Sequence, residues 1–311
     1  MTQNLNIKKI EARISENPSD FVTESESAFK KQITNIGTHI AEKKTHIIFL
    51  AGPSSSGKTT TAKMLAEELS RLGKKVDRIS LDNFYKGVDS LTRWKNGQPN
   101  YESIKGLDLD YLAVLLKKLQ ETGKADFPIF DFTQKKRGEK TFSVEMAPGN
   151  YLIFEGIHAI NPKITDMIAS DECAKLYISV NSDFVDEENN VALSGRELRL
   201  IRRILRDGIT RATSPAQVFE MWEGVALGEK HYIHPTKKHA ETLIDSVHYY
   251  EPNLYRNFLL SVLEKETIPK QYQNLENRLK TAVERFTPLD LSLIPKTSLL
   301  REFIPSISEN N

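Results

Sequence analysis

The chain has very little cysteine, no long hydrophobic run and almost no excess of charge of either sign. Cys173 is the single cysteine among 311 residues, which excludes an internal disulfide and disfavours a cysteine-based zinc site. No segment approaches the 18 consecutive apolar residues of a membrane-spanning helix. Residues 1–10 are polar and lack the apolar segment of a secretory signal. We therefore expect a cytoplasmic protein with no membrane partner.

The balance of charge also limits the partners. Lys and Arg number 43 against 42 Asp and Glu, so the formal net charge is +1. An overall basic surface for nucleic acid is excluded by this balance, although a local basic patch is not.

Short apolar segments alternate with helical patterns along most of the chain. Strands are expected at residues 47–51, 76–81, 151–154, 176–180 and 241–249. Helices are expected at residues 28–41, 58–72, 107–119, 194–211 and 215–232, and two more after residue 251. This alternation predicts an α/β protein with a doubly wound parallel sheet.

The same pattern suggests three parts. We expect an N-terminal helical extension over residues 1–44, a core over 45–250 and a C-terminal helical extension over 251–311 that wraps against the core. A helical lid is expected to be inserted into the core at about residues 183–232.

The turn after the first strand carries the strongest functional signal. Its sequence is Gly52-Pro53-Ser54-Ser55-Ser56-Gly57-Lys58-Thr59, which matches the P-loop pattern G-x-x-x-x-G-K-[ST] at every fixed position. Glycines let backbone N–H groups point at phosphate oxygens, and the helix N-terminus adds partial positive charge. We expect Lys58 to reach the terminal phosphates of ATP and the Thr59 hydroxyl to hold Mg²⁺. Thr60 completes the predicted nucleotide-binding segment. The N-K-x-D and D-x-x-G patterns of GTPases are absent.

A carboxylate follows each of the next two predicted strands. Asp82 comes after the second strand, where it can accept a proton from an attacking hydroxyl, help to hold Mg²⁺ or simply cap a turn. Glu155 ends an apolar strand, which favours the acidic Walker B role of binding Mg²⁺ directly or through water. His158, three residues further on, is given no role.

One predicted helix is dense in arginine: Arg196, Arg199, Arg202, Arg203, Arg206 and Arg211. Three interpretations compete. The helix could present a solvated, salt-bridged face, or a patch for nucleic acid, although the segment lacks aromatic residues. It could also be a phosphotransferase lid whose arginines neutralise charge on the transferred phosphoryl group. The P-loop favours the lid.

Taken together, these residues resemble the uridine kinase and phosphoribulokinase family of P-loop kinases, and more closely its bacterial uridine kinase-like nucleoside kinases. Beyond the P-loop, the similar segments are Leu81-Asp82-Asn83-Phe84-Tyr85 (L-D-x-F-Y), Pro128-Ile129-Phe130-Asp131-Phe132 (P-x-Y-D-F), Phe154-Glu155-Gly156-Ile157, residues 199–207 (R-L-x-R-R-x-x-R-D), residues 235–240 (P-T-K-K-x-A) and residues 298–304. The likeness covers about residues 45–304 in order.

The resemblance implies transfer of the γ-phosphoryl group of ATP to the 5′-hydroxyl of a nucleoside, with uridine as the first candidate. It gives Asp82 the role of catalytic base and places Lys58, Arg202 and Arg206 at the transferred group. The P-loop with Arg199, Arg203 and Arg211 would hold ATP, and Thr59, Glu155 and Asp82 would hold Mg²⁺. The nucleoside would be held by Tyr85, Tyr101, Glu102, Phe130, Asp131, Lys135 and Arg137.

The sequence departs from the family where the base is bound. Phe130 and Lys135 stand where uridine kinases have a tyrosine and a histidine, which changes the donors and acceptors that face the base. Two alternatives therefore stay open: a kinase of the same family that acts on a sugar phosphate or another small alcohol, and a non-catalytic ATP-binding protein associated with RNA. Nucleic acid is not the expected partner, and a homo-oligomer is compatible with the sequence.

Overall fold

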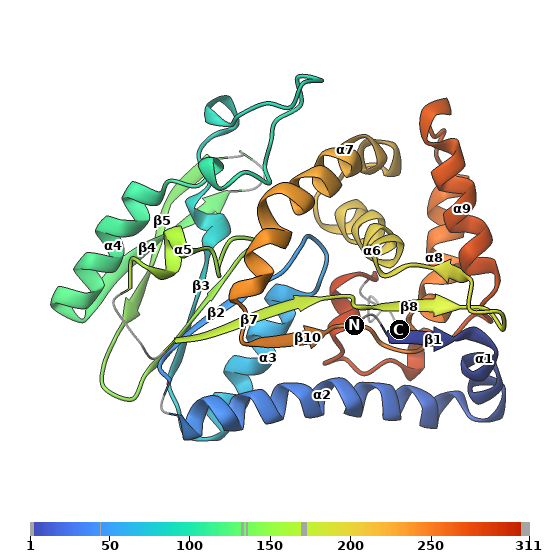
Figure 1. Ribbon diagram of the computed structural model, residues 1–311, viewed down its shortest axis with the longest axis horizontal. Coiled ribbons are helices and arrows are strands. Elements are labelled where there is room, and N and C mark those ends of the chain that lie inside the picture. The colour runs from blue at the N-terminus through green and yellow to red at the C-terminus, as the bar shows by residue number, and fades with distance from the viewer. Residues whose placement is uncertain (1–2, 44, 132–133, 135, 169–172, 306–311) are drawn as a thin grey trace, which may run out of the picture.

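A parallel β-sheet forms the centre of the molecule in the computed structural model (Figure 1), which describes residues 3–43, 45–131, 134, 136–168 and 173–305. Its strands are β2 (Ile47–Ala51), β3 (Val76–Ser80), β6 (Tyr151–Glu155), β7 (Cys173–Ser179) and β10 (Thr242–Asp245). Their order across the sheet is β10-β7-β2-β6-β3, and every pairing is parallel. The predicted α/β fold is confirmed.

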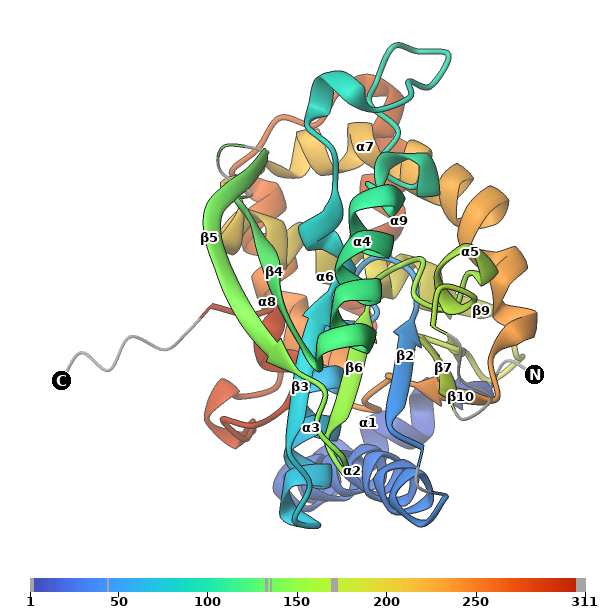
Figure 2. The same cartoon turned by 90° about the vertical axis from the view of Figure 1, so that its left-hand side faces the viewer.

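Helices cover both faces of this sheet. Alternate side chains of β2 point to opposite sides, so Ile48 and Leu50 join one core while Ile47 and Phe49 join the other. The first core contains apolar residues of α2 (Pro18–Glu42) and α3 (Lys58–Arg71), and the second contains those of α4 (Leu109–Thr122). Figure 2 shows α4 on the face opposite α2. The central strands β2 and β6 are mostly apolar because both of their faces are buried.

Two smaller sheets accompany the central one. A hairpin of β4 (Lys124–Asp131) and β5 (Lys136–Glu145) is antiparallel and contacts α4 through β4. A three-stranded sheet contains β1 (Gln3–Asn6), β8 (Ser182–Val185) and β9 (Val191–Leu193), and β1 pairs with β8 in parallel. The remaining helices are α1 (Ile7–Glu16), α5 (Pro162–Thr165), α6 (Gly195–Thr210), α7 (Pro215–Gly228), α8 (Glu251–Glu264) and α9 (Gln273–Glu284).

The last strand is shorter than predicted. The prediction of a strand over 241–249 is wrong beyond residue 245, because the Asp245 side chain accepts hydrogen bonds from the main-chain nitrogens of Asn181 and Val247 and so turns the chain. Val247 and Tyr250 are still buried, but they pack in the core just ahead of α8.

The N-terminal part contains more structure than predicted. The helix expected over 28–41 begins at Pro18, where the Asn17 side chain caps it by accepting from the Asp20 nitrogen. α2 packs along α3, and β1 and α1 precede it. These contacts join residues 3–43 to the core, and the three-part division of the chain stays a prediction. Among the described residues no helix is long and apolar enough to cross a membrane.

Candidate active site

The register of the sheet brings three strand ends together. Glu155, the last residue of β6, lies opposite Leu50 of β2 on one side and Ser80 of β3 on the other. The P-loop begins two residues after Leu50, and Asp82 follows Ser80 by two residues in a 3-10 turn, η1 (Leu81–Phe84). The P-loop, Glu155 and Asp82 are therefore neighbours at the carboxyl edge of the sheet, where ligands of open α/β sheets bind.

Two P-loop glycines are required by the geometry. A Cβ at Gly52 would lie 2.1 Å from the main-chain oxygen of Ile178, so no larger residue fits. Gly57 caps α3 with φ at 85°, in the left-handed region, and Ser55 has φ at 57°. The loop is thus curled ahead of the N-terminus of α3, as phosphate binding requires.

Lys58, Thr59 and Glu155 meet at the loop. The Thr59 hydroxyl lies 3.4 Å from a carboxylate oxygen of Glu155, and the Lys58 ammonium donates to the main-chain oxygen of Pro53 at 2.9 Å. Burial raises the pKa of Glu155, and the charge of Asp82 raises it further. Burial lowers the pKa of Lys58, against the attraction of Glu155 and Asp82. The site therefore holds charges that a bound anion and cation would compensate.

These oxygens suit Mg²⁺. Among the described residues there is no group of three or more His, Cys, Asp or Glu side chains that could hold a metal ion alone. Mg²⁺ in kinases usually takes one or two protein oxygens and completes its shell with substrate phosphates and water. The Thr59 hydroxyl and the Glu155 carboxylate would provide these one or two protein oxygens.

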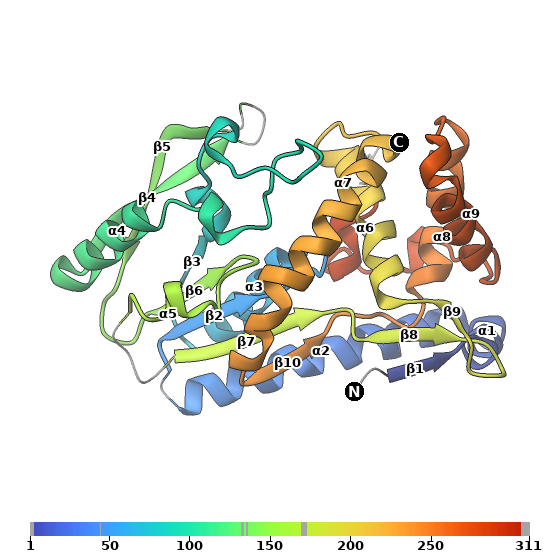
Figure 3. The same ribbon diagram turned by 45° about the horizontal axis from the view of Figure 1, so that its top comes forward.

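Three arginines of the helix α6 are buried rather than solvated, while Arg196 of the same helix is exposed. Arg199, Arg202 and Arg203 are exposed by 3%, 0% and 8%. The solvated-face interpretation is therefore wrong, and these three side chains cannot form a surface patch for nucleic acid. α6 lies beside α7 (Figure 3), and three of its arginines bind the P-loop. Arg199 donates to the main-chain oxygen of Ser54 and pairs with Glu229, while Arg203 donates to the Ser54 hydroxyl.

Arg202 lies elsewhere than predicted. All five of its N–H groups are used within the protein: two bind the Glu251 carboxylate, two bind Ser246 and one binds the main-chain oxygen of Ser55. The guanidinium also stacks over the Phe303 ring, 5.0 Å from its centre. With no exposed surface and no unused donor, Arg202 supports the P-loop at its strained residue and does not face a phosphate.

Arg203, Arg206 and Arg211 surround one carboxylate. Asp207 is buried and lies within ion-pair distance of Arg203, Arg206 and Arg211, at 3.3, 2.7 and 3.5 Å. The Nε and Nη2 atoms of Arg206 both contact Asp207, whereas its Nη1 lies 3.9 Å from Glu302. Nη1 is thus the atom of Arg206 that could add a bond to a phosphate.

Three of the residues predicted to hold the acceptor, Tyr85, Tyr101 and Phe130, cluster near Asp82. The rings of Tyr101 and Phe130 each lie 6.4 Å from that of Tyr85, edge to face. Glu102 is 7% exposed, its Oε2 has no hydrogen-bond partner among the described residues, and burial raises its pKa to about 7. Gly228 leaves room for it, since a Cβ there would lie 2.1 Å from that of Glu102. Burial raises the pKa of Tyr85, and the negative charge of Asp82 raises it further.

Three predicted acceptor residues are placed differently or not described. Arg137 pairs with Asp108, the N-cap of α4, and stacks over the Tyr111 ring at 4.8 Å, which ties the hairpin to α4. Asp131 accepts from the main-chain nitrogen of Gln134 at the turn between β4 and β5. Lys135 lies outside the described residues.

Two residues of the site are missed by the sequence analysis. His158 is fully buried beside the main chain of Glu102, and burial lowers its pKa to about 4. Glu302, close to the C-terminus, accepts a hydrogen bond from the Thr60 hydroxyl. The place of His158 three residues after Glu155 is a signal that it lies near the site. No local sequence pattern places Glu302 at the P-loop.

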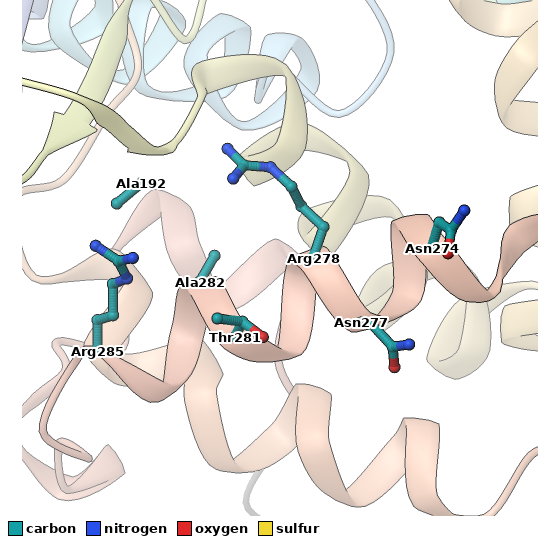
Figure 4. A pocket seen from close by; sticks show the side chains of 7 residues that line it. All are labelled: Ala192, Asn274, Asn277, Arg278, Thr281, Ala282 and Arg285. Atoms are coloured by element: carbon teal, nitrogen blue, oxygen red, sulfur yellow. The ribbon is translucent and has the colours of Figure 1, made fainter.

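A shallow pocket of about 260 Å³ lies away from this site, along α9 (Figure 4). It is lined by Ala192, Asn274, Asn277, Arg278, Thr281, Ala282 and Arg285. Arg278 is engaged with Glu197 of α6, so this pocket lies at the junction of α9 with the lid.

The fold and the P-loop geometry define a P-loop kinase, a phosphotransferase. The chain belongs to the phosphoribulokinase / uridine kinase family, whose model matches residues 47–251. It acts on a nucleoside or another small molecule.

Among known relatives, the uridine kinase of Lactococcus lactis subsp. cremoris (strain MG1363) is 32% identical over 203 residues, which cover 65% of this chain and 88% of that protein. The uridine kinase of Macrococcus caseolyticus (strain JCSC5402) is 31% identical with the same coverage. Among solved structures, a possible uridine kinase from Bacillus stearothermophilus is similar with a TM-score of 0.41 and 16% identity, covering 64% of this chain and 88% of that one. Phosphoribulokinase from Rhodobacter spheroides is similar with a TM-score of 0.42 and 21% sequence identity, covering 64% of this chain and 68% of that one.

Proposed function

We propose that the chain transfers the γ-phosphoryl group of ATP to the 5′-hydroxyl of a nucleoside, with uridine as the first candidate. The observation that carries this proposal is the position of Asp82, two residues after Ser80, which pairs with Glu155 at the end of β6. From there its charge acts on Lys58 and Glu155 of the P-loop site and on Tyr85 and Glu102, two of the residues predicted to hold the acceptor. A carboxylate between a phosphate site and an acceptor pocket is where a general base must act.

The nucleotide half follows from the P-loop. Its N–H groups and Lys58 would bind the phosphates, and Arg206 would add a planar donor to the transferred group. Thr59 and Glu155 would hold Mg²⁺, which neutralises phosphate charge when bound. Arg199, Arg202 and Arg203 would act indirectly, by fixing the loop that carries the N–H groups.

The acceptor half follows from the aromatic and acidic side chains beyond Asp82. Tyr85, Tyr101 and Phe130 offer ring faces and edges against which a planar base can pack. The unpaired oxygen of buried Glu102 can accept a hydrogen bond from a hydroxyl group of the acceptor. Asp82 would orient the attacking hydroxyl and remove its proton as the phosphoryl group is transferred.

A second acceptor class has its own support. Phe130 lacks the hydroxyl of the family's tyrosine, so the pocket has fewer groups that distinguish one base from another. Glu102 would bind the hydroxyls of a sugar phosphate as well as those of a ribonucleoside. We therefore keep a small alcohol or sugar phosphate as the alternative acceptor.

The test is ADP release from ATP and Mg²⁺ with uridine, cytidine, thymidine, adenosine, guanosine and a panel of sugar phosphates. We expect turnover with uridine and with at least one other ribonucleoside, and none with a Lys58→Ala variant. Turnover with a sugar phosphate and with none of the nucleosides would replace the first acceptor class by the second. A preference for uridine of more than about a thousandfold, roughly 4 kcal/mol, would show that another residue distinguishes the base.

A further inference from the structure

The C-terminal segment, residues 298–304, lies on the P-loop. Its 3-10 helix η8 (Leu299–Glu302) contacts α3 (Figure 1), and Leu299 fills the space beside Gly57, where an added Cβ would lie 2.7 Å from its Cδ1. Leu299, Leu300 and Phe303 are fully buried. Ser298 donates to Glu26 of α2. The segment is therefore fixed in place by apolar side chains and lies outside residues 47–251, the part that the family model matches.

Glu302 directs its carboxylate at groups that a nucleotide needs. One oxygen accepts from the Thr60 hydroxyl at 2.5 Å, and the other lies 3.9 Å from Nη1 of Arg206. The side chain of Glu302 remains 21% exposed. Thr60 belongs to the first turn of α3, whose N-terminus attracts anions. Arg206 is already paired with Asp207 at 2.7 Å, so Glu302 is a second anion beside it, placed at the first turn of α3.

Bound phosphates would meet a charge of their own sign here. The triphosphate needs the P-loop and Arg206, and the Glu302 carboxylate binds Thr60 of the first and lies 3.9 Å from Nη1 of the second. Like charges at short range in a partly buried site weaken binding. The apolar anchors keep the segment seated, so relief comes from rotation of the flexible Glu302 side chain into solvent, which its partial exposure permits.

We propose that Glu302 is an affinity-determining residue of the nucleotide site, an internal anion that holds Thr60 and Arg206 and competes with the phosphates of ATP. This inference rests on the proposed binding of ATP to the P-loop. It makes the C-terminal segment a component of that site.

The test compares ATP binding to the full-length wild-type chain and to Glu302→Gln, Glu302→Ala and Glu302→Asp by calorimetry. Loss of the charge should lower the Kd for ATP about five- to twentyfold in both the Gln and the Ala variant. The Asp variant keeps the charge and should stay near the wild type. Because the effect is electrostatic, the gain should shrink when the salt concentration rises from about 0.05 to 0.5 M.

The matched control is Glu284→Gln, the same change of charge at an exposed position of α9, which should leave the Kd unchanged. Thermal unfolding of each variant separates folding from binding. A Kd for Glu302→Gln and Glu302→Ala that is unchanged or higher than that of the wild type would overturn the inference and make Glu302 a structural or nucleotide-holding residue. A wild-type chain that binds no ATP would instead overturn the proposed function.

Discussion

Several carboxylates around the P-loop are buried and therefore poorly hydrated. Glu102 and Glu155 are both buried, and burial raises the pKa of each. Such groups lie where substrates bring compensating charge or hydrogen bonds, which is why displaced pKa values cluster in functional sites. The cost of keeping them ionised is a property of the free protein, and it can be measured without any substrate.

Glu102→Gln should change how stability depends on pH. The pKa of Glu102 is about 7 in the folded chain against an ordinary 4.5, so the folded state binds more protons than the unfolded state between these values. Stability contributed by this group is therefore lost as pH rises from about 4.5 to about 7. At about 1.4 kcal/mol for each pH unit, the variant should be more stable than the wild type by about 3 kcal/mol at pH 8 and about equal at pH 4.5.

The measurement is urea unfolding of both proteins across this pH range, with Glu121→Gln at an exposed position of α4 as the control. Parallel curves for the wild type and Glu102→Gln would contradict the assignment of a buried, unpaired carboxylate.

Asp82→Asn should reduce turnover far more than nucleotide affinity. The amide keeps the shape of the side chain but cannot accept the proton of the attacking hydroxyl, and loss of a general base typically costs about 10²- to 10⁴-fold. The Kd for ATP should change less than about threefold, since no P-loop contact is removed. Steady-state kinetics together with calorimetry separate the two quantities. If only the ATP affinity changed, Asp82 would belong to the nucleotide site instead.

At the scale of elements, α6 joins parts of the chain that are distant in sequence. Its arginines bind the P-loop, Glu229 after α7 and Glu251 at the start of α8. The helix begins with a capping box of Ser194 and Glu197, which fixes its start locally. α6 therefore ties the P-loop to the segments after α7 and at the start of α8, whether or not it also acts as the predicted lid.

Arg202→Met should lower the free energy of unfolding by about 3–5 kcal/mol, because it leaves the fully buried Glu251 without its cation. The double variant Arg202→Met with Glu251→Met should recover most of this loss, since no buried charge is then unpaired. Chemical denaturation of the single and double variants measures both effects. Arg196→Met is the control, because Arg196 is exposed on the same helix. Equal stability of Arg202→Met and Arg196→Met would show that the buried pair contributes nothing.

How much of these elements can be predicted depends on how local their causes are. The P-loop, Glu155 and the helical pattern of α6 depend on neighbours within a few residues, and the sequence predicts them. The orientation of the Arg202 side chain depends on Glu251, which is 49 positions away in the sequence. The orientation of the Glu302 side chain depends on Thr60, which is 242 positions away. Spacing along the chain carries no information about such partners. The hairpin β4–β5 was not predicted, and Pro128 interrupts its first strand at a register shift.

At the scale of the whole molecule, the N-terminal part completes the first core. Phe21, Val22, Phe29, Ile33 and Ile40 of α2 are all at least 94% buried, and β1 adds a strand to β8. At about 1.5–3 kcal/mol for each fully buried apolar side chain, α2 contributes about 10 kcal/mol. That is as large as the net stability of a typical domain.

A chain lacking residues 1–44 should therefore fail to fold cooperatively, although it retains every residue matched by the family. Circular dichroism during heating should show a broad transition or none, and the protein should expose apolar surface to a dye. The control lacks only residues 1–6, and should unfold cooperatively at a lower temperature than the complete chain. A sharp transition with ATP binding in the shorter chain would show that the family core is sufficient.

The contact between Thr60 and Glu302 also has a consequence for synthesis. A ribosome adds about 5–20 residues per second, so the 242 positions that separate these two side chains take about 12 to 50 s to make. During that interval the P-loop has emerged, but Glu302 has not been added. A nascent chain would thus meet cellular ATP with a phosphate site that still lacks its internal anion, and any nucleotide bound then would favour the folded core before the last residues are in place.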